Sequence, residues 1–168
     1  MQTEELRAIQ APLKERYRDD PDAAVVTLDA SATLGEGVTC KVRTGQALAD
    51  AGLHPATGGD GAALCSGDML LEALAACAGV TMRAVATSIG LAVEGQIRAE
   101  GDLDFRGTLG VDRDAAVGFR SIRLTFDLDT DAPDQQVDKL IELTERYCVV
   151  LQTLVATPAP AVTWARST

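Results

Sequence analysis

The sequence predicts a single domain in which two long apolar helices are combined with antiparallel β-strands. Two stretches, 69–86 and 130–157, have helical apolar patterns, and segments with the composition or alternation of strands surround them. At 168 residues the chain can bury one hydrophobic core but is too short for two ordinary domains. We therefore expect one domain over residues 1–168.

The N-terminal part of the chain is predicted to hold a short helix, a hairpin and a loop. Apolar residues recur at helical spacing over 3–18, so we expect a helical appendage over residues 1–20. Residues 23–45 are rich in Val and Thr and are interrupted by glycines, which indicates a β-hairpin with Cys40 in its second strand. Residues 50–68 are rich in Gly, Pro and Asp and predict a loop that lacks the glycine pattern of a phosphate-binding motif.

The stretch 69–86 is apolar nearly all round the helix that it predicts. A helix without a polar face normally runs through the core, so we expect this one to be buried. The surrounding stretch 64–90 is long enough to cross a bilayer, but it carries three charged residues and much alanine. A core helix therefore fits better than a membrane span.

Residues 91–110 and 118–129 predict two strands of an antiparallel sheet with one face in water. The second strand alternates strictly between apolar and polar side chains. Its apolar residues, which we expect to point inward, are Ile122, Leu124, Phe126 and Leu128.

Residues 130–157 predict a second helix, with Asp131 or a neighbour as its cap and Pro133 in its first turn. Cys148 faces the core in this interpretation. The predicted core stripe consists of Val137, Ile141, Thr144, Cys148, Leu151 and Val155. The tail that follows, to residue 164, is expected to be weakly ordered and to end in a short edge strand.

Charge and composition argue against several classes of protein. The net charge of −10 would repel nucleic acid and anionic lipid, so neither is an expected partner. The N-terminus has no apolar signal-peptide core, and we expect a cytoplasmic protein in which stable disulfides are rare. With no Cys-x-x-Cys pair and a single histidine, His54, no metal site is expected.

Cys77 lies in the middle of the first predicted core helix. Small neighbours, among them Ala76, Ala78 and Gly79, would let another backbone approach closely enough for a disulfide. Cys148, on the core stripe of the other helix, is the natural partner. Cys65 is a weaker candidate, because twelve helical residues separate it from Cys77 by about 18 Å. Cys40 cannot be placed, and Cys77 could also serve for packing alone.

Two motifs, SGDMLLEALAAC and ERYCVVLQTL, resemble the OsmC/Ohr family of peroxide-reducing proteins over residues 25 to 165. The resemblance implies an α+β fold with antiparallel sheets around two central helices, in an intertwined homodimer with active sites at its interface. Cys77 would be the peroxidatic cysteine and Cys148 the resolving one. Two departures stand out: Val149 follows Cys148 where the family often has proline, and Asp68 stands where it often has glutamate.

The resemblance also implies a mechanism without a cofactor. A Cys77 thiolate would reduce an organic hydroperoxide, and an external dithiol would reduce the resulting disulfide with Cys148. An arginine on a strand would offset the cost of burying the thiolate. Arg43 is our preferred candidate, and Asp68 could orient an arginine of the partner chain or simply favour the helix start. The other candidate arginines are Arg98, Arg106, Arg120 and Arg123.

Two other functions compete with this interpretation. A non-catalytic protein of the same fold would bind a small apolar ligand and contain inert thiols. A cysteine hydrolase would need His54 beside Cys77, which is difficult for a cysteine inside a buried helix.

Overall fold

The computed structural model describes residues 2–5, 8, 10, 11, 19, 31–34, 39–44, 47–110, 112–156 and 159–166. The predicted helix over 3–18 and the appendage over 1–20 fall mostly outside these residues. In chain order the elements are β1 (Ser31–Leu34), β2 (Thr39–Thr44), β3 (Ala47–Gly52), the 3-10 helix η2 (Pro55–Thr57), β4 (Leu64–Cys65), α2 (Ser66–Ile89), β5 (Glu94–Leu103), α3 (Phe105–Thr108), β6 (Phe119–Asp129), α4 (Asp134–Tyr147) and α5 (Val149–Ala156).

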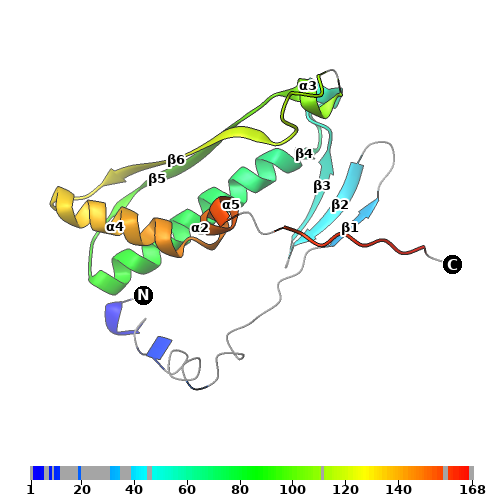
Figure 1. Ribbon diagram of the computed structural model, residues 1–168. Coiled ribbons are helices and arrows are strands. Elements are labelled where there is room, and N and C mark those ends of the chain that lie inside the picture. Colours follow the sequence, from blue (N-terminus) through cyan, green and yellow to red (C-terminus); the bar gives the residue numbers. More distant parts are fainter. Residues whose placement is uncertain are drawn as a thin grey trace.

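The strands form two sheets (Figure 1). The first sheet has the order β1-β2-β3-β4, with antiparallel pairs except between β3 and β4, which run parallel. Its first two strands are the predicted hairpin, and Cys40 lies in the second strand opposite Leu34. The predicted loop over 50–68 is only partly a loop, because it contains the end of β3, η2 and β4.

The second sheet is the antiparallel pair β5 and β6, which runs along α2 (Figure 1). The predicted alternation in β6 is confirmed, since Ile122, Leu124, Phe126 and Leu128 are all less exposed than the residues between them. Phe126 and Leu128 contact the core residues of the helices.

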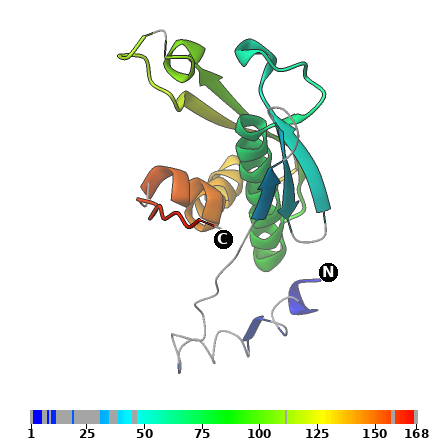
Figure 2. The same cartoon turned by 90° about the vertical axis from the view of Figure 1, so that its right-hand side faces the viewer.

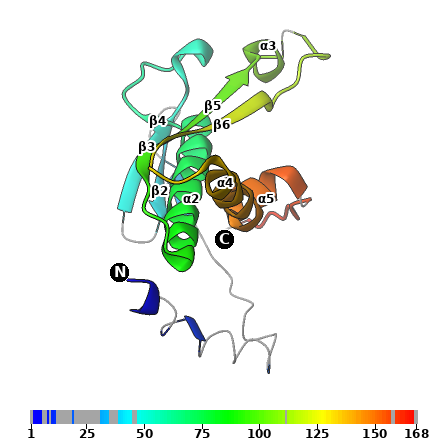
Figure 3. The same ribbon diagram turned by 90° about the vertical axis from the view of Figure 1, so that its left-hand side faces the viewer.

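Helix α2 is the central element of the described fold. The four-stranded sheet and the pair α4–α5 lie on opposite sides of it (Figures 2 and 3). The helix predicted over 69–86 is confirmed and is longer by three residues at each end. It ends at Gly90, whose left-handed conformation (φ 71°) lets its N–H bond to the carbonyls of Ala86 and Thr87.

One expectation for α2 is wrong in the described chain: the helix is not covered on all sides. Leu74, Ala78 and Met82 are buried on one face, whereas Val80, on another, is 73% exposed. By length and composition α2 is the one helix of the described residues that would be able to cross a membrane. Its buried face contacts β5, α4 and α5.

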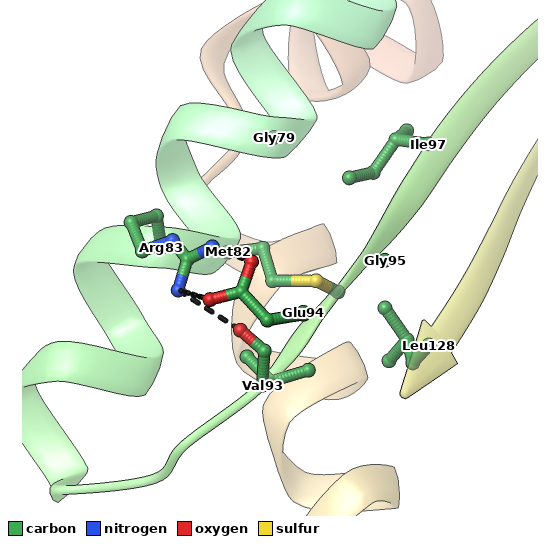
Figure 4. A pocket seen from close by; sticks show the side chains of 8 residues that line it. All are labelled: Gly79, Met82, Arg83, Val93, Glu94, Gly95, Ile97 and Leu128. Atoms are coloured by element: carbon green, nitrogen blue, oxygen red, sulfur yellow. Dashed lines mark hydrogen bonds and ion pairs between the residues drawn. The ribbon is translucent and has the colours of Figure 1, made fainter. Parts of the chain in front are cut away.

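Arg83 ties the C-terminal half of α2 to the start of β5. Its guanidinium donates to the Val93 carbonyl at 2.9 Å and forms an ion pair with Glu94 at 3.0 Å (Figure 4). The same residues border a small cavity of about 40 Å³ beside Gly79 and Ile97. The contacts of Arg83 link α2 to the start of β5, in the part of the helix that follows Cys77.

The prediction of a single helix over 130–157 is wrong. The chain forms two helices there, α4 and α5, which are separated at Cys148. Helix α4 begins later than expected, with Pro133 itself at the N-cap position and not in the first turn. The break also changes the predicted stripe. Leu140 and Thr144 are fully buried, whereas Val155, beyond the break, is 72% exposed. The described residues of the tail, 159–166, form no strand.

Candidate active site

Cys77 and Cys148 lie together in one apolar cluster between α2, the β5–β6 ribbon and α5. Cys77 is half-buried on α2, and Cys148 is fully buried at the junction of α4 and α5. Their side chains hydrogen-bond to each other, and both thiols are free. Leu74 and Ala78 of α2 complete the buried centre of the cluster.

The break at Cys148 is a change of backbone direction at one residue. Its φ of −71° and ψ of 104° are those of extended chain. Its N–H still donates to the Thr144 carbonyl at 2.9 Å, which closes α4, and its carbonyl accepts from the Gln152 N–H at 2.9 Å, which opens α5. The Gln152 side chain also donates to the Glu145 carbonyl at 2.9 Å and so bridges the two helices.

The break leaves backbone donors directed at the sulfurs. The first N–H groups of any helix have no carbonyl partner within that helix. In α5 these groups belong to Val149, Val150 and Leu151, and all three hydrogen-bond to a cysteine sulfur. Cys148 therefore stands in the N-cap position of α5, where a side-chain acceptor for such groups is favoured.

The hydrogen bonds at Cys77 favour its thiolate. Burial alone raises the pKa of this thiol, but the Val150 N–H, the Cys148 thiol, the Thr81 hydroxyl and the Val149 N–H together lower it below its ordinary value. A sulfur that accepts four hydrogen bonds is better stabilised as an anion than as a neutral thiol. Cys77 is thus the sulfur that loses its proton first.

Cys148 has the opposite shift. Its complete burial raises the pKa most, the Leu151 N–H lowers it, and the neighbouring Cys77 raises it further. Two sulfurs in hydrogen-bonding contact do not readily carry charge together. The pair therefore combines a Cys77 whose pKa is lowered with a Cys148 whose pKa is raised and whose S–H donates to Cys77.

A largely apolar groove of about 490 Å³ adjoins the cluster that contains the two cysteines. Leu74 and Leu151 belong both to the groove and to the cysteine cluster, so the two share a wall, although neither cysteine lines the groove itself. Arg120 and Glu145 are its charged residues. The other lining residues are Phe119, Ser121, Ile122, Leu124, Phe126, Leu154 and Val155.

The arginine expected beside Cys77 is not among the groups that shift its pKa. Arg43 lies in β2, opposite Leu48, and its side chain falls outside the described part of the structure. Its role stays a prediction.

The alternative arginines have other surroundings. Arg106 forms ion pairs with Asp104 and Asp112, and Arg123 forms one with Asp102. Arg120 lies 3.9 Å from Asp104. Arg98 lies on the exposed face of β5, turned away from the cysteines.

Asp68 and His54 both lie near the start of α2 and away from Cys77. Asp68 is exposed in the first turn of the helix, nine residues before Cys77. His54 stacks on Phe105, with ring centroids 5.0 Å apart, and lines a separate cavity of about 350 Å³ with Cys65. The structure does not bring His54 to Cys77. A hydrolase in which His54 acts as the general base for Cys77 is therefore not supported.

Sequence reasoning missed the donors that surround the Cys77 sulfur. The amino-acid composition does not show which backbone N–H groups are free to donate. No Pro or Gly before Val149 indicates the break between the helices. Thr81 had a detectable signal, because a residue four positions after Cys77 lies on the same helix face. Within the described part of the chain, no three His, Cys, Asp or Glu side chains gather as metal ligands do.

Comparisons with known proteins agree on one family. The model of the family described as OsmC-like protein matches residues 58–164. A comparison with curated protein sequences gave no match.

Several solved structures share the fold at low sequence identity. An OsmC-like protein from Mycoplasma pneumoniae is 19% identical with a TM-score of 0.65, covering 77% of this chain and 88% of its own. An organic hydroperoxide resistance protein OsmC from Legionella pneumophila is 17% identical with a TM-score of 0.58, covering 78% and 90%. The organic hydroperoxide resistance protein OhrB of Bacillus subtilis is 19% identical with a TM-score of 0.52, covering 77% and 91%. The fold is therefore the α+β fold of these proteins.

Proposed function

The chain belongs to the OsmC-like protein family, and we propose that it is a thiol peroxidase that reduces organic hydroperoxides. The observation that carries the proposal is the hydrogen-bonded pair of Cys77 and Cys148, with the first thiol acidified and the second kept neutral. A thiolate is the nucleophile in peroxide reduction, and a nearby second thiol is what converts its oxidised product into a disulfide. Two relatives with this fold bear the name of organic hydroperoxide resistance proteins.

In the first step the Cys77 thiolate attacks the terminal oxygen of the hydroperoxide. An S–O bond forms, the O–O bond breaks, and the alkoxide leaves as an alcohol after it takes a proton. The neutral Cys148 thiol, which already donates toward Cys77, can supply that proton. Cys77 is then a sulfenic acid and Cys148 a thiolate.

In the second step the Cys148 thiolate attacks the Cys77 sulfur. A disulfide forms and hydroxide leaves, which becomes water by taking a proton from the solvent. An external dithiol then reduces the disulfide by exchange and is itself oxidised. No cofactor takes part in this cycle, and we propose the reducing cytoplasm as its compartment.

The groove beside the cysteines supports an organic hydroperoxide as the substrate. Its walls are mainly aliphatic and aromatic, and they would bury the alkyl or aryl part of such a molecule. Hydrogen peroxide has no apolar part and gains nothing from these walls. We therefore expect bulky hydroperoxides to react faster than hydrogen peroxide.

A homodimer is part of the proposal, because the described chain leaves large apolar side chains in water. Val80 on α2, and Tyr147, Val149 and Val155 around the α4–α5 break, are all more than half exposed. Several large apolar side chains left in water on two neighbouring elements are typical of a surface that another chain covers. A second copy of the chain would cover it and would close the open side of α2.

A thiol titration tests the proposal. Reduced protein would be treated with one equivalent of cumene hydroperoxide, and free thiols would be counted before and after. We expect two thiols to be lost for each hydroperoxide and to return with dithiothreitol. Unchanged thiols would contradict the peroxidase function and would favour a non-catalytic protein that binds an apolar ligand in the same groove.

A further inference from the structure

The side chain of Gln152 crosses the break between α4 and α5. Its amide donates to the backbone carbonyl of Glu145 at 2.9 Å, seven residues earlier in the chain. The backbone of the same residue opens α5, because the Gln152 N–H donates to the Cys148 carbonyl at 2.9 Å. Gln152 is thus bonded both to the last turn of α4 and to the residue at the break.

The Glu145 carbonyl is the acceptor that a continuous helix would use for Val149. In an α-helix each N–H bonds to the carbonyl four residues earlier. Within residues 112–156, all of which the structure describes, the Val149 N–H makes no hydrogen bond to this carbonyl, and the Gln152 amide bonds to it instead. The sequence has no Pro or Gly at the break that would enforce it. The Gln152 side chain therefore competes with the hydrogen bond that would join α4 and α5 into one helix.

The break determines where α5 lies. Cys148 has a ψ of 104°, whereas helical residues have about −42°, so the chain turns at this residue and α5 contacts α2. Cys148 itself is fully buried. A continuous helix would carry α5 away from the cluster and expose Cys148 to solvent. The side chains of α5 that pack against the cluster are Val150, Leu151 and Leu154.

We propose that Gln152 is a positioning residue, whose side chain holds the break between α4 and α5 and so keeps α5 closed over the Cys77–Cys148 pair. The cover exists whether or not the pair reduces peroxides, and only its importance for catalysis rests on the proposed function. Gln152 is exposed and acts through the Glu145 carbonyl, not by touching the sulfurs. One hydrogen bond contributes a modest free energy, so it sets how often α5 opens and does not by itself fix the fold.

The test measures how often Cys148 becomes accessible in the folded protein. A fully buried thiol reacts with N-ethylmaleimide only in molecules that have opened locally, so its labelling rate is proportional to the open fraction. The rate would be followed on the Cys148 peptide by mass spectrometry. The full-length Cys77→Ser variant is the background, so that modification of Cys77 does not disturb the cluster.

Four substitutions separate the hydrogen bond from the other properties of the side chain. Gln152→Met keeps the length and removes the donor, and Gln152→Glu keeps the shape but has a carboxylate, which cannot donate. Gln152→Lys keeps a donor on a long side chain. Thr153→Val is the matched control, because the Thr153 hydroxyl is also exposed but its hydrogen bond stays within α5, at the Val149 carbonyl (2.8 Å).

We expect Gln152→Met and Gln152→Glu each to raise the labelling rate of Cys148 about fivefold, which is the factor that one hydrogen bond of ordinary net strength gives. Gln152→Lys and Thr153→Val should stay within about twofold of the background. The rise should persist unchanged up to about 1 M urea, because local opening exposes little surface. A general loss of stability would instead give a labelling rate that increases steeply with urea.

An unchanged rate in both Gln152→Met and Gln152→Glu would overturn the role of Gln152. An equal rise in Gln152→Lys or Thr153→Val, or a rise that grows with urea, would overturn it as well, since none of these depends on the hydrogen bond across the break. No peroxide enters this measurement. A wild-type protein that ignores cumene hydroperoxide would therefore end the proposed function and leave the result for Gln152 intact.

Discussion

The backbone N–H of Val150 donates a hydrogen bond to the sulfur of Cys77, although the two residues belong to different helices. This contact exists because α4 and α5 are separated at Cys148, which frees the first N–H groups of α5. The positive end of a helix favours an anion in the same position. Backbone donors thus lower the pKa of the Cys77 thiol, whatever Arg43 adds.

Val149→Pro tests the contribution of these donors. Proline is well tolerated in the first position of a helix, and the extended conformation of Cys148 suits a residue that precedes proline. The variant should fold normally but lose the Val149 N–H, so we expect the pKa of Cys77 to rise by several tenths of a unit. Val149→Ala, which keeps the N–H, is the control. Equal alkylation profiles in the two variants would show that the Val149 N–H contributes nothing.

The elements with strong periodicity could be predicted from the sequence. Helix α2 and strand β6 have clear apolar patterns that predict a helix and a strand, and the structure contains both. The break at Cys148 could not be predicted, because the apolar pattern continues across it and Val149 is only a weak helix breaker. The exposure of Val80 was also missed, since a helix that is apolar all round looks the same whether its own chain or a second chain covers it.

The candidate site was predicted in part. Helix faces and small neighbours were enough to suggest that Cys77 and Cys148 meet, and the structure places them in contact. The donors at the sulfur were not predicted, because Val149 and Val150 act through their backbone and not through their side chains. The assignment of Arg43 depended on the resemblance alone, and nothing in the described residues tests it.

The two thiols should titrate in a fixed order. The pKa of Cys77 is lowered, so its alkylation should rise with pH around a midpoint below the ordinary value of about 8.5. The pKa of Cys148 is raised, so its alkylation should begin only above that value. Quantifying both peptides from pH 5 to 11 checks this order. A lower midpoint for Cys148 than for Cys77 would reverse the assignment of nucleophile and resolving residue.

The disulfide formed by peroxide should join Cys77 to Cys148. Cys65 lies at the N-cap of α2, about 18 Å along the helix from Cys77, and cannot reach it while the helix is intact. Non-reducing peptide mapping after one equivalent of hydroperoxide should therefore show one dominant linkage. Cys65→Ser should not change it. A dominant bridge that contains Cys40 or Cys65 would contradict the proposed pair.

Light scattering should give twice the mass of the 17.6 kDa chain at micromolar concentration. Val80→Glu should weaken this dimer by at least about tenfold in dissociation constant, because it would place an unpaired charge within the covered face of α2. Val117→Glu is the matched control, since Val117 is similarly exposed but lies in the segment between α3 and β6. A monomeric wild-type protein would remove the homodimer from the proposal.

Cys77→Ser should abolish consumption of organic hydroperoxide. A serine hydroxyl has a far higher pKa than a thiol and supplies no nucleophile at neutral pH, whatever hydrogen bonds surround it. The change is nearly isosteric at a half-buried position, so circular dichroism should match that of the wild-type protein. Peroxide consumption with dithiothreitol is the measurement, and Cys65→Ser is the control that should stay active. A folded Cys77→Ser variant that works at the wild-type rate would exclude Cys77 as the nucleophile.

Cys148→Ser should stop the cycle after its first step. Serine is a favoured N-cap residue, so it can take the place of the thiol at the start of α5 and the fold should persist. Cys77 can still attack the hydroperoxide, but no second thiol removes the sulfenic acid that results. Without a reductant, one equivalent of hydroperoxide should therefore leave a sulfenic acid that dimedone labels on the Cys77 peptide. The wild-type protein should give a disulfide and little label. Equal labelling of both proteins would mean that Cys148 does not resolve the intermediate, and excess hydroperoxide should over-oxidise Cys77 in the variant far sooner than in the wild type.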